Sequence, residues 1–308
     1  MSFKIHFMGT PEFAVPVLKS INNSNHEVLT VYTQSPKKKA RGQKIIESPI
    51  HQCANKLNIP VRFPKDINSD EEYNFIKNSK VDIVIVVAYG KILPSKILNL
   101  PNIKFINIHA SLLPKWRGAA PIQRAIMNKD KETGISIMEI VKELDAGPVM
   151  KFVKTEIKKD TTYGNLSDKL SNLSASTILD CLSIIEKKKE NFVPQNHTKA
   201  TYAKKIDKSE TKINWNDKAE NIVAKINSLH PKPGCWFKLN NYRVKVLEAK
   251  EIEAQGKPGE IINNQFSIAC SENAIQILYL KKEGKNSMSA SNFIIGNKLK
   301  VGTNLNEL

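Results

Sequence analysis

The stretch VDIVIVVAYG, residues 81–90, decides the fold class of this chain of 308 residues. Residues 83–88 are apolar without interruption, which is typical of a strand buried on both faces of a parallel sheet. Other apolar runs alternate with amphipathic stretches, the runs at 4–9, 27–33 and 104–110 and the stretches at 12–22, 48–58, 69–79 and 119–128. Because strands and helices alternate, the sequence predicts a doubly wound α/β domain with a mostly parallel sheet.

The pattern changes towards the middle of the chain. Two more apolar runs and a long amphipathic helix close the first domain, at 134–140, 148–157 and 163–187. Residues 188–208 are polar, contain Pro194 and have no clear period, which predicts a linker. We therefore expect a first domain at 1–188 and a linker at 189–208.

The last hundred residues predict a small β domain. A helix at 216–230 should end at the HPKPG sequence, because proline cannot continue it. Short strand-like runs separated by Gly and Asn then follow: CWFKL, YRVKVLEAKEI, EIINN, FSIAC and AIQILYL. Their spacing predicts an open β-barrel at 209–308.

Charge and cysteine usage narrow the class of protein. The net charge of +17 attracts polyanions, but the basic excess is spread along the whole chain. Nucleic-acid binding and an ordinary lysine-rich surface therefore both stay open. The four cysteines lie far apart and form no C-x-x-C pair, which indicates reduced thiols. No apolar run is long enough for a signal peptide or a membrane span, so we expect a cytoplasmic protein.

Asn107 and His109 form the first candidate site. They are two residues apart at the end of a predicted strand, so both side chains point to the same side. Ligands of open α/β sheets bind at this end of the strands. An amide and an imidazole aimed at one point can bind a developing oxyanion, and the imidazole can move protons. The alternative is a polar pair that only satisfies its own hydrogen bonds.

Asp145, in the stretch ELDAGPVM, is the third candidate. A carboxylate between two strands can orient and charge a histidine, although an aspartate before Gly-Pro is also a common turn residue. The turn of Ser111, Leu112, Leu113 and Pro114 offers an apolar wall and backbone groups of the kind that a flat ligand needs.

Other chemistries are disfavoured. The turn GTPEFA at 9–14 contains one glycine and no G-x-G-x-x-G, and the second strand ends in Thr33 and Gln34 rather than in an acid. A dinucleotide cofactor is therefore not expected. The sequence has no H-x-x-x-H pair and no G-x-S-x-G elbow, so we expect neither a metal nor a serine nucleophile.

The stretch NIHASLLPKWRGAAPI, followed by ELDAGP, resembles the 10-formyltetrahydrofolate-dependent formyltransferases. GTPEFAVP, VVAYGKILP, ATYAKKI and HPKPGCWF extend the similarity over nearly the whole chain. The resemblance implies a Rossmann-like domain, a linker and a C-terminal barrel of oligonucleotide-binding type. It also implies transfer of a formyl group from the cosubstrate 10-formyltetrahydrofolate to the methionine α-amine of initiator tRNA, without a metal and by a monomer.

The resemblance also implies roles for individual residues. The catalytic residues would be Asn107, His109 and Asp145. The folate-binding residues would be Ser111, Leu112, Leu113 and Pro114, with Val87, Ala88, Tyr89 and Gly90 of the loop alongside.

The loop at 35–49 is the expected tRNA contact. It has five cations within eight residues, namely Lys37, Lys38, Lys39, Arg41 and Lys44. Arg41 before Gly42 matches the arginine of the family's loop, although this loop has fewer Gly and Pro residues and is slightly shorter. Lys205 is a further expected contact. We expect the loop to lie on the sheet edge of His109 and to be mobile without ligand, whereas the alternative is a solvated charged loop.

Three rival functions use parts of the same sequence. A sugar-amine formyltransferase would share the three catalytic residues but would not need the lysine-rich loop. A glycinamide ribonucleotide formyltransferase would end near residue 200. A nucleic-acid-binding module that has lost catalysis would not need Asn107, His109 and Asp145 together.

Overall fold

The computed structural model describes residues 2–39 and 44–307. The chain divides into two compact units. Unit 1 comprises Met1–Pro121, Glu132–Thr155 and Ser167–Lys204, and unit 2 comprises Ile122–Lys131, Glu156–Leu166 and Lys205–Leu308. Two short pieces that lie within residues 1–188 of the sequence therefore belong to unit 2. The domain bounds expected from the sequence, 1–188 and 209–308 with a linker at 189–208, stay a prediction.

Unit 1 is built on a seven-stranded sheet in the order β10-β9-β7-β6-β1-β2-β5. The strands are β1 (Lys4–Gly9), β2 (Glu27–Tyr32), β5 (Val61–Arg62), β6 (Ile83–Val87), β7 (Lys104–His109), β9 (Glu132–Glu139) and β10 (Val149–Glu156). The strands from β5 to β7 are parallel, and β9 runs antiparallel to β7. The predicted mostly parallel α/β sheet is confirmed.

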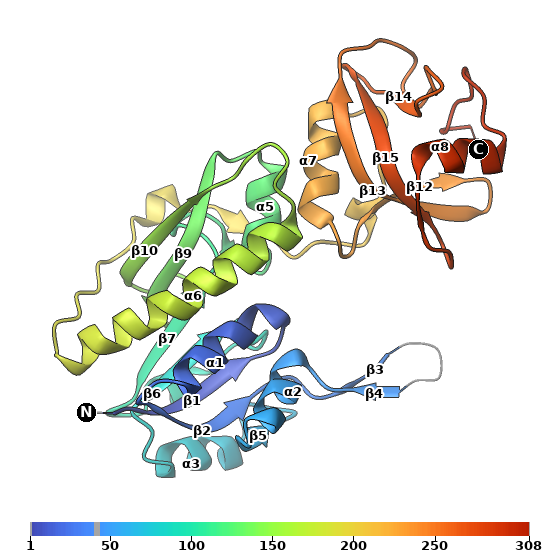
Figure 1. The fold of residues 1–308 in the computed structure, drawn as a ribbon. Coiled ribbons are helices and arrows are strands. Elements are labelled where there is room, and N and C mark those ends of the chain that lie inside the picture. Colours follow the sequence, from blue (N-terminus) through green and yellow to red (C-terminus); the bar gives the residue numbers. More distant parts are fainter. Residues whose placement is uncertain (1, 40–43, 308) are drawn as a thin grey trace. The chain divides into compact units, whose positions relative to one another are not determined.

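Helices cover both faces of this sheet (Figure 1). They are α1 (Val15–Asn22) after the 3-10 turn η1 (Glu12–Ala14), α2 (Pro49–Lys56), α3 (Asp70–Asn78), α4 (Ser95–Leu98) and α6 (Tyr163–Glu186). The strand β6 explains the arrangement, because Ile83 and Ile85 pack in the core with α1, α2 and α6. Val84 packs in the other core, with α3 and α4. An uninterrupted apolar run is what a strand between two helix layers requires.

The carboxyl ends of the parallel strands meet at one edge of the sheet. Gly9 at the end of β1 pairs with Val87 at the end of β6, and Val86 pairs with Asn107 of β7. A side chain at position 9 would lie 3.1 Å from the Val87 carbonyl oxygen, which accounts for the glycine. The turns after β1, β6 and β7 therefore gather beside His109.

The lysine-rich segment contains a hairpin. β3 (Lys37–Lys39) pairs antiparallel with β4 (Lys44–Ile46), and Figure 1 shows both extending away from the sheet of unit 1. Arg41, between these strands, lies outside the described residues. The sequence predicts a charged loop at 35–49 that is mobile without ligand. Residues 37–39 and 44–46 of this segment pair as strands, and the mobility stays a prediction.

The polar segment expected as a linker also pairs with unit 1. β11 (Tyr202–Ala203) runs parallel to β8 (Arg117–Gly118). In the sequence, β8 is the next strand after β7, which carries Asn107 and His109. Val193 exchanges two backbone hydrogen bonds with Val149 of β10. Such short pairings have no sequence period, so a pattern of polar residues did not predict them.

Unit 2 contains a five-stranded antiparallel sheet, formed by β12 (Cys235–Leu239), β13 (Tyr242–Ile252), β14 (Ser267–Ala269), β15 (Ala274–Lys282) and β16 (Ser287–Ser289). Its helices are α5 (Pro121–Met127), α7 (Ala219–Leu229) and α8 (Ala290–Asn297). The core includes Trp215, Phe237, Phe266 and Phe293. The predicted C-terminal antiparallel β domain is confirmed.

Two details of unit 2 bear on the sequence predictions. Helix α7 ends at Leu229, directly before the HPKPG sequence, as predicted. The EIINN stretch forms no strand, and its Glu260 and Ile261 make isolated bridges instead. In residues 2–39 and 44–307, the structure contains no helix long and apolar enough to cross a bilayer.

Candidate active site at the end of β7

The structure brings Asn107, His109 and Asp145 together. Asn107 and His109 lie on β7, and Asp145 lies in the turn between β9 and β10. The Asn107 Nδ2 atom donates to Asp145 Oδ1 at 3.4 Å, and His109 Nδ1 lies 3.6 Å from Asp145 Oδ2. The two-residue spacing on a strand therefore presents both side chains to one carboxylate. Their catalytic roles stay a prediction.

The Asp145 carboxylate is held by the segment that follows β7. The backbone N–H of Gly118 donates to Asp145 Oδ2 at 2.8 Å. Trp116, Gly118 and Asp145 all have positive φ angles, of 61°, 117° and 49°. For residues other than glycine such backbone costs on the order of 1–3 kcal/mol, and it concentrates where function requires a fixed geometry.

The His109 ring is oriented by a hydrogen bond at its Nε2 atom. Its Nε2 atom lies 2.8 Å from the Trp116 carbonyl oxygen, and the residue is only 6% exposed. A carbonyl oxygen can only accept, so Nε2 carries a proton and donates it to Trp116. The Nδ1 atom faces Asp145 at a distance too long for a direct hydrogen bond. Nδ1 is therefore the ring nitrogen that a substrate atom can engage.

Gln195, which is bonded to Arg117, holds the backbone of the turn that contains Asp145. The Arg117 Nε and Nη2 atoms donate to Gln195 Oε1 at 3.1 and 2.7 Å. The Gln195 Nε2 atom donates to the carbonyl oxygens of Asp145 and Gly147 at 2.9 and 2.7 Å. Sequence reasoning assigned no role to either residue, because Gln195 lies in the polar stretch that was expected to be a linker.

A cavity of about 630 Å³ adjoins this cluster. Its walls include Ala146 and Gly147 beside Asp145, together with Gln195 and the exposed Leu144 and Tyr202. This volume lies within the range of small-molecule pockets.

The predicted folate turn at 111–114 is held by side-chain hydrogen bonds. The Ser111 hydroxyl donates to the Lys115 carbonyl at 2.6 Å, so it is already used within the turn. The Ser136 hydroxyl donates to the Ser111 carbonyl and accepts from the Leu113 N–H. Leu113 is buried against Met138 and Val149, whereas Leu112 and Pro114 are partly exposed. A ligand at this turn would therefore contact Leu112 and Pro114.

The predicted folate loop at 87–90 divides into core and surface residues. Val87 and Tyr89 are buried in the two cores of the sheet, so their side chains point away from the surface. Ala88 and Gly90 are exposed and have φ angles of 49° and 79°. The loop is held by Thr10, whose hydroxyl donates to the Tyr89 carbonyl at 2.8 Å. Ala88, Gly90 and backbone groups are what this loop offers a ligand.

The predicted tRNA contacts lie in different parts of the chain. Lys37, Lys38, Lys39 and Lys44 belong to the β3–β4 hairpin of unit 1. Lys205 is exposed in unit 2.

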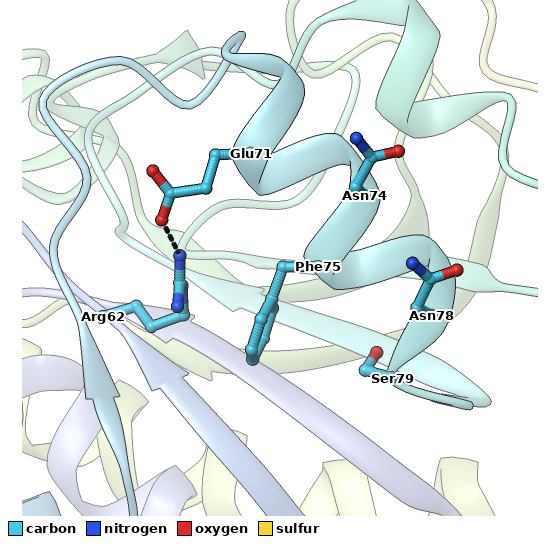
Figure 2. Close-up of a pocket in the computed structure, with 6 residues that line it drawn as sticks. All are labelled: Arg62, Glu71, Asn74, Phe75, Asn78 and Ser79. Carbon is cyan, nitrogen blue, oxygen red and sulfur yellow. Dashed lines mark hydrogen bonds and ion pairs between the residues drawn. The ribbon is translucent and has the colours of Figure 1, made fainter.

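A second cavity, of about 460 Å³, lies on α3 (Figure 2). Its charged groups are Arg62 and Glu71, which pair with each other at 2.8 Å. Arg62 also pairs with Glu72 at 2.6 Å and stacks on Phe75. The polar atoms that remain belong to Asn74, Asn78 and Ser79 on one helix face. The charge in this cavity is therefore used within the fold.

Neither metal ligands nor reactive thiols gather in the described part of the chain. Residues 2–39 and 44–307 hold no group of three or more His, Cys, Asp or Glu residues that could bind a metal. Burial raises the pKa of Cys181 to about 11 and the pKa values of Cys235 and Cys270 to about 12. These thiols stay protonated at neutral pH and act as core residues.

Comparison with known proteins identifies the family of this chain. The protein-family model for formyl transferases matches residues 3–182 of the sequence. The family model for the formyl transferase C-terminal domain matches residues 205–298. A methionyl-tRNA formyltransferase of Pelagibacter ubique (strain HTCC1062) is 47% identical over 307 residues, covering 99% of each chain. One from Chelativorans sp. (strain BNC1) is 40% identical over 310 residues, covering 99% of this chain and 100% of the relative.

Solved structures with low identity share the fold. The sugar 3N-formyl transferase WlaRD has a TM-score of 0.68 at 20% identity, over 93% of this chain and 100% of that one. HypX from Aquifex aeolicus, in complex with tetrahydrofolic acid, has a TM-score of 0.67 at 18% identity, over 97% of this chain and 48% of that one. A matched family model spans more than half of the sequence and includes Asn107, His109 and Asp145. The chain belongs to the formyl transferase family.

Proposed function

We propose that this chain transfers the formyl group of 10-formyltetrahydrofolate to the α-amine of methionyl initiator tRNA. The observation that carries this proposal is its identity of 47% and 40%, over nearly the full length, to relatives named methionyl-tRNA formyltransferase. We further propose that the chain acts in the cytoplasm and as a monomer. Light scattering tests the oligomeric state, because a monomer has a mass of 34.6 kDa.

In the proposed reaction the methionine nitrogen forms a bond to the formyl carbon. The carbonyl electron pair moves to oxygen, and when it returns the bond from carbon to N10 of the folate breaks. The amine loses one proton and N10 gains one, so the transfer needs no oxidant or reductant. The chain has to stabilise the oxygen anion and move this proton.

Asn107 and His109 are the proposed donors to the oxygen anion. The amide of Asn107 and the Nδ1 side of His109 both border the Asp145 carboxylate, which supports a shared target. The protonated ring donates from Nδ1, because Nε2 already donates to Trp116. Asp145 orients the imidazole and assists a water in removing the amine proton. Loss of one such donor typically costs on the order of 100- to 1,000-fold in rate.

The folate would bind along the turn at 111–114 and the loop at 87–90. The partly exposed Leu112 and Pro114 supply an apolar wall, and the exposed Ala88 and Gly90 present backbone groups. Flat ligands are held by this combination of an apolar wall and a few fixed polar groups. Ser111, Leu113, Val87 and Tyr89 would support the site from within, because all four are buried.

The β3–β4 hairpin is the proposed contact for the acceptor end of tRNA. It leaves β2 at the same edge of the sheet as His109, because β1, β2, β6 and β7 are parallel. Lys37, Lys38, Lys39 and Lys44 would meet phosphates, Arg41 would also reach a base edge, and Lys205 would add a phosphate contact from unit 2.

The test compares three acceptors with 10-formyltetrahydrofolate and the purified chain. Charged initiator tRNA, a charged methionine elongator tRNA and a nucleotide-linked amino sugar are incubated separately, and formylated product is measured by mass spectrometry. We expect formylation of the initiator tRNA. If only the amino sugar is formylated, the chain is a sugar formyltransferase and the proposal is wrong.

A further inference from the structure

Gln195 uses its whole side-chain amide on two segments of unit 1. Its Nε2 group donates both protons, one to the Asp145 carbonyl and one to the Gly147 carbonyl. Its Oε1 atom accepts twice from Arg117. The residue is 7% exposed. A buried amide with all its hydrogen-bonding capacity used holds its neighbours in one arrangement.

The backbone that Gln195 holds is the turn that carries the Asp145 carboxylate. Asp145 has a φ angle of 49°, a conformation that persists only when its surroundings impose it. On the other side of the turn, a Cβ atom at Gly147 would lie 1.9 Å from the Glu139 carbonyl oxygen of β9. The turn is thus fixed between β9 and Gln195.

Arg117 connects this backbone contact to the carboxylate itself. Arg117 is 4% exposed, and its guanidinium bonds to Gln195 and, at 3.2 Å from Nη2, to His197 Nδ1. Among the described residues no carboxylate pairs with it, so Gln195 supplies its principal acceptor. The next residue, Gly118, donates its N–H to Asp145 Oδ2. These contacts therefore form a closed ring that includes the Asp145 carboxylate. The other members of the ring are Gln195, Arg117 and Gly118.

We infer that Gln195 is a positioning residue, which sets the Asp145 carboxylate against Asn107 and His109. It touches neither of these side chains and acts only through the backbone of the turn and through Arg117. The kinetic part of this inference rests on the proposed formyl transfer. A misplacement of a catalytic group by about 1 Å can cost on the order of 100-fold in rate.

The decisive variant is Gln195→Glu in the full chain. Glutamate keeps acceptor oxygens for Arg117, so we expect the buried guanidinium to stay paired and the fold to be retained. It loses the amide donors and turns a negative oxygen towards the Asp145 and Gly147 carbonyls. We expect kcat to fall about 10- to 100-fold, with both KM values within about twofold of wild type, because the substrate-contacting residues are unchanged.

Asn196→Asp is the matched control. It makes the same exchange of amide for acid at the neighbouring residue, which is exposed. Its Oδ1 atom still accepts from the Thr198 N–H, so the local turn is preserved. We expect wild-type kcat for Asn196→Asp.

Amide hydrogen exchange gives a readout that does not depend on activity. The Gly118 N–H is held by the Asp145 side chain, whereas the adjacent Ala119 N–H is held by the Ala203 backbone. We expect Gln195→Glu to speed exchange at Gly118 by about tenfold or more, the loss expected for a hydrogen bond to a charged acceptor, and to leave Ala119 unchanged.

Two outcomes would overturn the inference. In one, Gln195→Glu keeps wild-type kcat and Gly118 exchange. In the other, Gly118 and Ala119 lose protection together and the melting temperature falls, which means that Gln195 only supports the fold. If the wild-type chain formylates no acceptor, the proposed function fails, and the exchange rates at Gly118 and Ala119 still decide whether Gln195 positions Asp145.

Discussion

Asp145 contacts four other residues in and around the proposed site. Its carboxylate meets Asn107, His109 and Gly118, and its carbonyl oxygen accepts from Gln195. The first two partners were predictable, because a strand repeats every two residues and this fixes where Asn107 and His109 point. Gly118 and Gln195 were not, because their contacts depend on how distant segments pack.

Replacement of His109 by Ala, or of Asp145 by Asn, should nearly abolish formylation. The asparagine would keep the shape of the side chain but would present an NH2 group to a donor, either Asn107 or the Gly118 N–H. We expect kcat to fall by about 100-fold or more, with tRNA affinity near wild type. Single-turnover formylation and a binding titration measure these quantities. Retention of more than about a tenth of the rate by His109→Ala would contradict the assignment.

Gly118→Ala should destabilise the protein. Gly118 has a φ angle of 117°, and its added methyl group would lie 2.9 Å from the Ala203 carbonyl oxygen of β11. We expect a loss of about 1–3 kcal/mol in the free energy of unfolding, measured with urea. Gly302→Ala is the control, because Gly302 also has a positive φ angle but nothing within 4 Å of the added atom. Equal losses in both variants would mean that the contact with β11 has no cost.

The buried His6 should make stability depend on pH. Burial and, secondly, Arg62 lower its pKa from 6.5 to about 4. The unfolded chain therefore binds a proton below pH 6.5 that the folded chain refuses until about pH 4. Stability is complete above pH 6.5 and falls between these values, by on the order of 3 kcal/mol.

The variant His6→Leu tests this dependence. The Ser79 hydroxyl that contacts His6 at 2.8 Å also donates to the Ile76 carbonyl, so the variant leaves it bonded. Urea unfolding at several pH values from 7 to 4 should have a shallower fall in stability for His6→Leu than for wild type. Identical curves would show that His6 does not carry the proton.

At the scale of elements, the sequence predicts long periodic segments well. The buried strand β6 and the helices α1, α3 and α7 follow directly from apolar spacing. The two-residue strands β5, β8 and β11 contain too few residues to have a period. EIINN was expected to be a strand on its apolar residues alone, and its residues pair only through isolated bridges.

The β3–β4 hairpin should contribute to tRNA binding through charge. Replacing Lys37, Lys38 and Lys39 together with glutamine should flatten the dependence of log affinity on log salt by roughly 0.7 to 0.9 for each phosphate that is no longer neutralised. Arg41→Ala should raise the KM for tRNA while leaving folate binding unchanged. Filter binding at several salt concentrations and steady-state kinetics measure both effects. If both variants behave as wild type, tRNA recognition lies elsewhere.

At the scale of the whole molecule, the two units can be separated in an experiment. Unit 1 extends to Lys204, so a fragment that ends at residue 188 lacks Gln195 and β11. Both fragments, 1–188 and 1–204, should fold around the seven-stranded sheet, but the longer should melt a few degrees higher (about 2–4 °C per kcal/mol for a domain of about 150–250 residues). Both should bind folate and formylate tRNA poorly, because the C-terminal domain is absent. Normal tRNA formylation by either fragment would contradict the proposed role of that domain.

Gln195 also determines when the proposed site is completed during synthesis. It is 50 residues further along the chain than Asp145, a separation of roughly 3–10 s at a translation rate of about 5–20 residues per second. In this interval the strands before Asp145 have been made, but the Arg117 side chain lacks Gln195 and His197, which it contacts in the described structure. The nascent chain therefore has a sheet before it has a finished site, and competence to react is acquired seconds later, when residues 193–203 are added.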